Sequence, residues 1–103
     1  MNKIQNFIKY MSTHKEVQKI LITHFAIIVI FAIIYKEINN NDLKSFSNEK
    51  KMDMFDAFYF SAITHTTVGF GDISPETKYA KLSSMTHVLL VFFIGFLEIN
   101  QII

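Results

Sequence analysis

Several residue types that particular functions require are absent from this chain of 103 residues. It contains no Cys, which excludes disulfides and thiolate metal sites. All ten basic residues are Lys, which lacks the planar fork that Arg uses on bases and paired phosphates. With a net charge of only +1, nothing predicts a nucleic-acid partner. No nucleophile stands with a His and an acid in a catalytic pattern, so we expect no enzyme activity, cofactor or small-molecule substrate.

Charge is also absent from two apolar blocks, residues 20–35 and 82–97. Each would be roughly 24 Å long as a helix, which is shorter than the ~30 Å hydrocarbon core of a bilayer. Lys19, Lys36 and Lys81 can extend these blocks by lifting their ammonium groups to the interface. No small-residue cleavage pattern follows the first block, so we do not interpret it as a signal peptide. The sequence predicts two transmembrane helices, over 20–36 and 79–103.

The first 19 residues predict an amphipathic helix lying at the membrane interface. Their apolar side chains follow helical spacing, at Ile4, Phe7, Ile8 and Met11. The alternative is a frayed polar leader. Four lysines against one acid precede the first apolar block, whereas charges balance after it. The positive-inside rule then predicts that both termini are cytoplasmic.

The chain between the two blocks predicts a second, shorter helical element. Residues 37–52 are rich in Asn, Ser and Lys without periodicity, which favours an exposed loop. Asp53 is a suitable N-cap for a short helix over 53–65. Gly69 and Gly71 would break any helix across 66–72. This order describes a half-helix that enters the membrane and turns back.

Backbone at membrane depth that is not helical survives only where protein shields it or where it lines a water-filled path. The segment 66–72 is therefore a candidate pore. Glycines at every second position allow successive carbonyls to turn toward one axis. One chain supplies a single oxygen at each level, so we expect a closed ring of four copies. The carbonyls would come from Thr67, Val68, Gly69 and Phe70, with the Thr67 hydroxyl below them.

This segment resembles the signature of potassium channels, a family whose filters are built of backbone carbonyls. A wider stretch is similar to the miniature potassium channels encoded by algal viruses. The signature is Thr67-Val68-Gly69-Phe70-Gly71-Asp72, and the wider likeness includes Tyr59-Phe60, Thr64-His65-Thr66, Ile73, Pro75, Ala80-Lys81-Leu82, His87 and Val91-Phe92-Phe93-Ile94.

The resemblance implies an all-α membrane protein with two transmembrane helices, a re-entrant pore helix and a selectivity-filter loop. It would assemble as a homotetramer in a host-cell or virion membrane and conduct K⁺ passively, the permeant ion being its only bound metal. The residues implied to bind K⁺ are Thr67, Val68, Gly69, Phe70 and Gly71. Those implied to support the filter and its outer mouth are Thr66, Asp72, Tyr59 and Phe60.

Three departures from larger channels bear on the stability of the filter. Tyr59 and Phe60 stand where they often have Trp. Phe70 stands where they have Tyr, so no phenol from the filter can bond the pore helix. Ile63 stands where some bacterial channels have a glutamate facing the equivalent of Asp72. Gly95, the only glycine of the second block, is interpreted as a packing site.

Four further polar residues carry separate expectations. Glu98 is the only charged residue after Lys81, and four copies could form a carboxylate ring at the inner mouth; alternatively, Glu98 marks the membrane boundary. His24, His65 and His87 have no metal-site spacing, and we expect each to face a helix neighbour or water.

Two other functions fit parts of the sequence. A two-span structural or assembly protein of a viral membrane would explain the length and hydropathy, but it gives no reason for the filter sequence. A non-selective cation channel would share the architecture, although such channels tend to lose the aromatic residue that Phe70 provides here.

Overall fold

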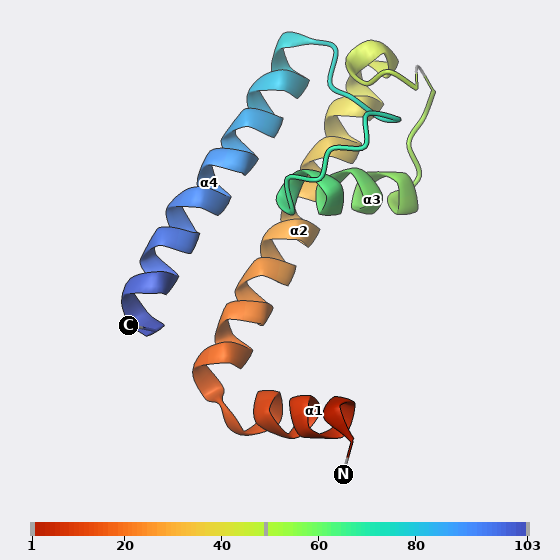
Figure 1. Cartoon of the computed structure of the whole chain (residues 1–103). Coiled ribbons are helices and arrows are strands. Elements are labelled where there is room, and N and C mark those ends of the chain that lie inside the picture. The colour runs from red at the N-terminus through yellow and green to blue at the C-terminus, as the bar shows by residue number, and fades with distance from the viewer. Residues whose placement is uncertain (1, 49, 103) are drawn as a thin grey trace.

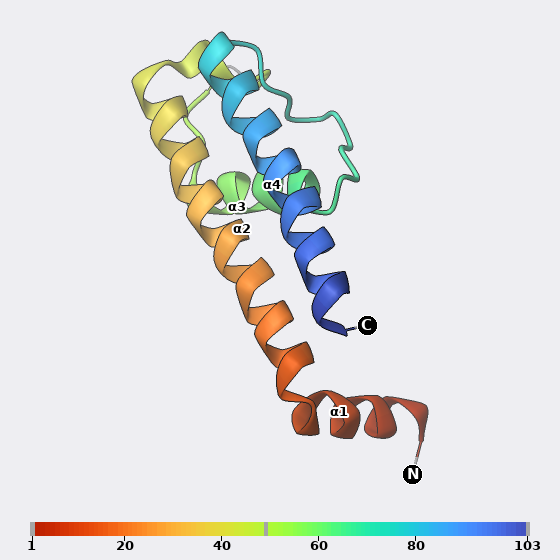
Figure 2. The same ribbon diagram turned by 90° about the vertical axis from the view of Figure 1, so that its left-hand side faces the viewer.

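The computed structural model describes residues 2–48 and 50–102. Two long antiparallel helices lie side by side, and a short helix crosses them part-way along their length (Figures 1 and 2). The two ends of the chain lie at the same end of the molecule (Figure 1). The elements are α1 (Lys3–Thr13), α2 (Lys15–Asn41), the 3₁₀ turn η1 (Leu43–Ser45), α3 (Met54–His65) and α4 (Lys78–Ile102).

Both long helices are apolar enough to cross a membrane. The 27 residues of α2 and the 25 residues of α4 correspond to roughly 40 and 37 Å, which exceeds the ~30 Å core. Helix α2 extends beyond the predicted 20–36 at both ends, because polar flanking residues continue it, whereas α4 begins one residue before the predicted 79–103. Large apolar side chains on α2 and α4 are exposed, which requires lipid or other copies to cover them. They include Leu21, Ile22, Phe25, Ile30, Ile33, Leu89, Phe92, Phe93 and Phe96.

The N-terminal residues form a separate helix that lies across the end of α2 (Figure 2). A capping box starts α1, in which Asn2 and Gln5 bond each other's backbone N–H. The chain then leaves helical geometry at His14 (φ −104°, ψ 96°). The Gln18 amide donates to the Ser12 carbonyl at 2.7 Å and ties the two helices at this corner. The single helix predicted over 1–19 is thus divided at His14, with residues 15–19 in α2.

The prediction of an exposed loop over 37–52 was wrong for several residues. Helix α2 continues to Asn41, and Asn39, Phe46 and Met52 are fully buried. The Asn39 amide accepts from the Met52 N–H at 2.7 Å and donates to the Lys50 carbonyl at 3.1 Å. The polar composition of the segment did not indicate this packing, because the apolar side chains that it buries in the core are those of Phe46 and Met52.

An aromatic cluster around Tyr35 joins α2, the loop, α3 and α4. The Tyr35 ring is fully buried and packs edge-to-face on Phe60 at 4.9 Å and on Phe46 at 6.0 Å between centroids. His87 of α4 stacks on Phe31 at 4.1 Å. These contacts fix the position of α3 against both long helices.

We predict that Asn39→Ala destabilises the protein by about 1–3 kcal/mol, because it leaves the buried Met52 N–H without a partner. Thermal unfolding in detergent measures the difference. The matched control is Asn40→Ala, since Asn40 is the exposed neighbour in the same helix. Equal melting temperatures for the two variants would contradict a structural role of the Asn39 amide.

Candidate ion pathway

Helix α3 stops part-way along α2, and the chain turns back from its end toward the start of α4 (Figure 1). The helix begins at Asp53, whose carboxylate accepts from the Asp56 N–H at 2.7 Å, as an N-cap does. At its other end the Thr66 N–H still bonds the Ala62 carbonyl at 3.0 Å, and the Thr67 N–H bonds Thr64 at 3.1 Å. From Thr67 onward the backbone is no longer helical.

The backbone of this segment has positive φ at every second residue. The angles are 62° at Thr67, 58° at Gly69 and 87° at Gly71, and no other non-glycine residue of the described chain has positive φ. Alternation of left- and right-handed residues turns successive peptide groups toward one side, whereas an ordinary strand turns them to opposite sides. Glycine adopts this geometry freely, but Thr67 adopts it at a cost.

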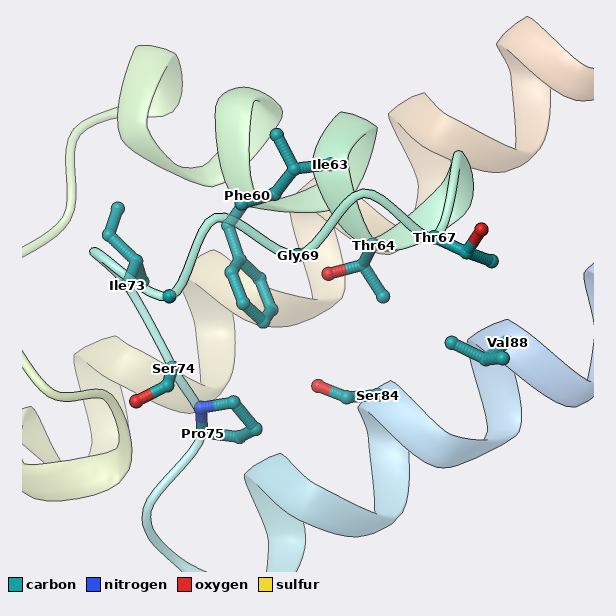
Figure 3. Close-up of a pocket in the computed structure, with 11 residues that line it drawn as sticks. Phe60, Ile63, Thr64, Thr67, Gly69, Ile73, Ser74, Pro75, Ser84 and Val88 are labelled. Atoms are coloured by element: carbon teal, nitrogen blue, oxygen red, sulfur yellow. The ribbon is translucent and has the colours of Figure 1, made fainter.

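One side of the segment faces its own chain, and the other is open. The Gly69 N–H donates to the Ile63 carbonyl at 3.2 Å, and a pocket of about 330 Å³ lies between the segment and α4 (Figure 3). Ser84 and Val88 form the α4 wall of this pocket (Figure 3). Val68 and Phe70 are 55% and 68% exposed. A Cβ added at either glycine would meet no atom within 4 Å, so this chain leaves that space empty.

The outer end of the segment is held by α3 and by the loop. The Tyr59 hydroxyl donates to the Asp72 carboxylate at 2.8 Å, and its ring stacks on Phe70 with 18° between the planes. Ser47 accepts from the Ser74 N–H through its hydroxyl at 2.9 Å, and its own N–H bonds the Ser74 carbonyl at 2.9 Å. The segment is therefore anchored beyond both glycines.

The Tyr59–Asp72 bond was not predicted. From the sequence we considered only a phenol from the filter itself, which Phe70 does not provide. The structure places a phenol on α3 instead, and it reaches Asp72. This bond raises the pKa of Tyr59, because the Asp72 carboxylate accepts a hydrogen bond that only the protonated phenol can donate. Phe60 lies behind the segment, 3% exposed, in the cluster around Tyr35.

Glu98 lies away from this segment, near the end of α4. Its carboxylate accepts from His24 of α2 at 2.7 Å, and its side chain is only 15% exposed. The sequence left two interpretations of Glu98 open, a carboxylate ring at the inner mouth or a marker of the membrane boundary. Within the chain the carboxylate of Glu98 bonds His24 of α2.

Among residues 2–48 and 50–102, no group of three or more His, Asp or Glu side chains is placed to hold a metal ion. His24, His65 and His87 nevertheless lie together, joined by hydrogen bonds. The candidate pathway is thus a backbone structure, and its ligands would be oxygen atoms of the main chain.

The chain matches a family model described as "Ion channel" over residues 21–100, which includes both long helices and the segment between them. It belongs to this ion channel family. The expected resemblance to the channels of algal viruses is confirmed. The chain is 43% identical over 74 residues to "Potassium channel protein kcv" of Paramecium bursaria Chlorella virus 1, covering 69% of this chain and 79% of the viral protein.

Other relatives share a shorter part of this channel. It is 54% identical over 43 residues to the "Hyperpolarization-activated voltage-gated potassium channel" of Methanocaldococcus jannaschii, which covers 42% of the chain and 20% of that protein. It is 50% identical over 44 residues to "Two pore potassium channel c" of rice, covering 43% of the chain and 9% of the plant protein. The chain therefore spans only a small part of these larger relatives. No solved structure matches it significantly.

We predict that Asp72→Asn lowers the pKa of Tyr59 toward its ordinary value, because the charged acceptor is lost. The raised pKa means that the bond persists through neutral pH and is lost only as pH rises above about 10. Phenolate absorbance against pH measures the change, and Tyr59→Phe identifies which part of the signal belongs to Tyr59. The matched control, Asp42→Asn, removes an exposed carboxylate that bonds only the Lys44 N–H and should leave the curve unchanged.

Proposed function

We propose that this protein is a potassium-selective channel whose filter is the segment Thr66 to Asp72. The observation that supports this best is the alternation of positive φ at Thr67, Gly69 and Gly71, between two helices long enough to span a membrane. This alternation lets successive carbonyl oxygens face one axis and replace the hydration shell of a potassium ion. The viral, archaeal and plant relatives are all named as potassium channels.

The proposed channel is a homotetramer. One chain offers a single carbonyl at each level of the filter, and a ring of four subunits is the symmetric arrangement that surrounds an ion. The open side of the segment and the exposed apolar faces of the long helices are consistent with contacts to other copies and to lipid. In this assembly α3 is the pore helix, and its C-terminal, partially negative end favours a cation in the pore below the filter.

The proposed orientation has both termini in the cytoplasm. Two spans return the chain to the side on which it began, and α1 and the last turns of α4 lie at the same end of the molecule (Figure 1). Four lysines against one acid precede the apolar block 20–35, which favours the cytoplasmic side for that end. The segment from Asp72 to Pro75 is then the outer mouth, and α1 lies at the inner interface.

Selectivity for potassium is favoured over a non-selective cation pore by the support around Phe70. Its ring stacks on Tyr59, which also bonds Asp72, so α3 holds Phe70 and Asp72 on the outer side of Gly69. A purely structural membrane protein would have no use for strain at Thr67.

We predict that the purified protein in a planar bilayer passes a current that reverses near the potassium equilibrium potential when potassium and sodium are on opposite sides. Barium, similar in size to potassium and doubly charged, should block the current by remaining in the filter. A reversal potential midway between the sodium and potassium values would indicate a non-selective pore. Absence of unitary currents would favour a structural protein.

We predict that Gly71→Ala abolishes conduction without preventing assembly. A Cβ at φ 87° costs on the order of 1 kcal/mol in each subunit, and symmetry repeats that cost around the filter, whereas the long helices are unchanged. The matched control is Gly95→Ala, because Gly95 is helical and a Cβ there meets no atom within 4 Å. Bilayer recordings and tetramer bands on mild gels measure both properties; normal currents from Gly71→Ala would remove this glycine from the pathway.

A further inference from the structure

Three histidines from three different helices form one continuous hydrogen-bonded chain, which ends on a carboxylate and on a phenol. His24 of α2 bonds Glu98 of α4 at 2.7 Å and His65 of α3 at 2.7 Å. His65 bonds His87 of α4 at 3.0 Å. His87 in turn bonds the Tyr35 hydroxyl at 2.7 Å. We name this set the imidazole chain; its members in spatial order are Glu98, His24, His65, His87 and Tyr35.

The imidazole chain runs from an accessible end to a buried one. The side chains of His24 and Glu98 are 25% and 15% exposed, and Glu98 lines an open pocket that also includes Lys19. His65 is 6% exposed, and His87 and Tyr35 are fully buried. From His24 to Tyr35 the chain extends roughly 16 Å along α2. The accessible end of the imidazole chain thus lies on the side of the chain termini.

The carboxylate determines the direction of every bond in this chain. Ionised Glu98 can only accept, so His24 donates from Nε2 and, when neutral, accepts at Nδ1. His65 must then donate from Nε2 and accept at Nδ1, and the same follows for His87. Tyr35 donates its hydroxyl proton to His87. With one proton on each imidazole, all four hydrogen bonds are made.

One added proton reverses three of these four bonds. An imidazolium at His24 donates from both nitrogens, so it keeps Glu98 as acceptor and makes His65 accept at Nε2. His65 and His87 then carry their protons on Nδ1, and His87 donates to the Tyr35 oxygen. Before the addition, His24, His65, His87 and Tyr35 each carry one titratable proton. Afterwards His24 carries two and the others one each, so the added proton accounts for the difference. Because the Tyr35 hydroxyl no longer donates to His87, it can donate its proton in a hydrogen bond to another acceptor.

A candidate acceptor lies on α4. The Ser84 hydroxyl is buried and has no hydrogen-bond partner in the described part of the chain. Ser84 also lines the pocket behind the proposed filter (Figure 3). A second place is at His65, which is the last residue of α3 and directly precedes Thr66. The chain thus contacts the filter's surroundings at two places.

We propose that the imidazole chain is a proton-binding site through which acid on the side of the chain termini reduces conduction. Imidazole is the side chain whose charge ordinarily changes between about pH 5 and 8, and His24 is the most accessible imidazole of the set. Its ring centroid lies 5.0 Å from that of His65 at the C-terminal end of α3. A positive charge there opposes the partially negative helix end that favours a cation in the pore. The inference rests on the proposed channel function.

The charged and titratable groups around His24 come from each helix packed against it. Helix α4 contributes Glu98, which favours the charged imidazole. Helix α3 contributes His65, and α2 contributes Lys19, which lines the same pocket as Glu98 and disfavours an added charge. Lys19 itself is exposed and pairs with Glu16 at 3.9 Å, so Glu98 is the dominant neighbour of His24.

The test is a bilayer recording in which only the solution on the side of the chain termini is acidified. From about pH 7.5 to about pH 5.5 we expect the unitary potassium current to fall about twofold or more, since each of four subunits gains a charge. His24→Gln, which keeps a donor and an acceptor but does not titrate, should remove the response. Glu98→Gln should move it to more acidic pH. The matched control is His14→Gln, because His14 is an exposed histidine outside the set, and it should respond as the parent does.

A second measurement covers the case in which His24→Gln does not assemble. Nitrogen NMR of the imidazoles in the parent protein should show the protons of His65 and His87 on Nε2 near neutral pH and on Nδ1 in acid. A parent current insensitive to acid, an unchanged response in His24→Gln, or tautomers that do not change with pH would each overturn the proposal. Absence of potassium current from the parent protein at every pH would instead contradict the proposed channel function. The NMR measurement of the tautomers would still test the imidazole chain.

Discussion

The burial of Tyr35 is the interaction on which the rest of the structure depends. Its ring lies where α2, the loop after η1, α3 and α4 meet, and it contacts Phe46 and Phe60 through ring edges. Without this cluster a short helix such as α3 would have little reason to remain between two long ones, since an isolated helix of its length is marginal. By holding α3 at a fixed depth, the cluster determines where the chain must turn back and hence where the proposed filter begins.

The proposed filter itself is poorly stabilised by its own chain. Val68 and Phe70 are largely exposed, and the segment is attached at its ends, through Thr66 and Thr67 to α3 and through Asp72 to Tyr59. Such a structure suits a site that is completed by symmetry. Each chain supplies the backbone geometry and the supports behind it, and the remaining ligands come from equivalent positions in other copies.

Several polar side chains between the helices bond one another or the backbone of the loop. Asn39 forms hydrogen bonds with the backbone of the loop. The histidines form hydrogen bonds with one another, and Glu98 and Tyr35 bond the two ends of this set. Polar residues buried at membrane depth are expensive and tend to be functional. Here they connect the inner end of the molecule to the neighbourhood of the proposed filter, which begins directly after His65.

The sequence by itself determined the two long apolar helices, the cap at Asp53 and the backbone geometry at Gly69 and Gly71, because apolar length, capping chemistry and glycine content are local properties. Only the tertiary structure decided that α2 continues to Asn41, that Phe46 and Met52 are buried, that Tyr59 bonds Asp72 and that Glu98 faces His24. It also brought together three histidines separated by 41 and 22 residues. Such pairings depend on how helices are placed relative to one another, and side-chain packing between distant segments sets that placement.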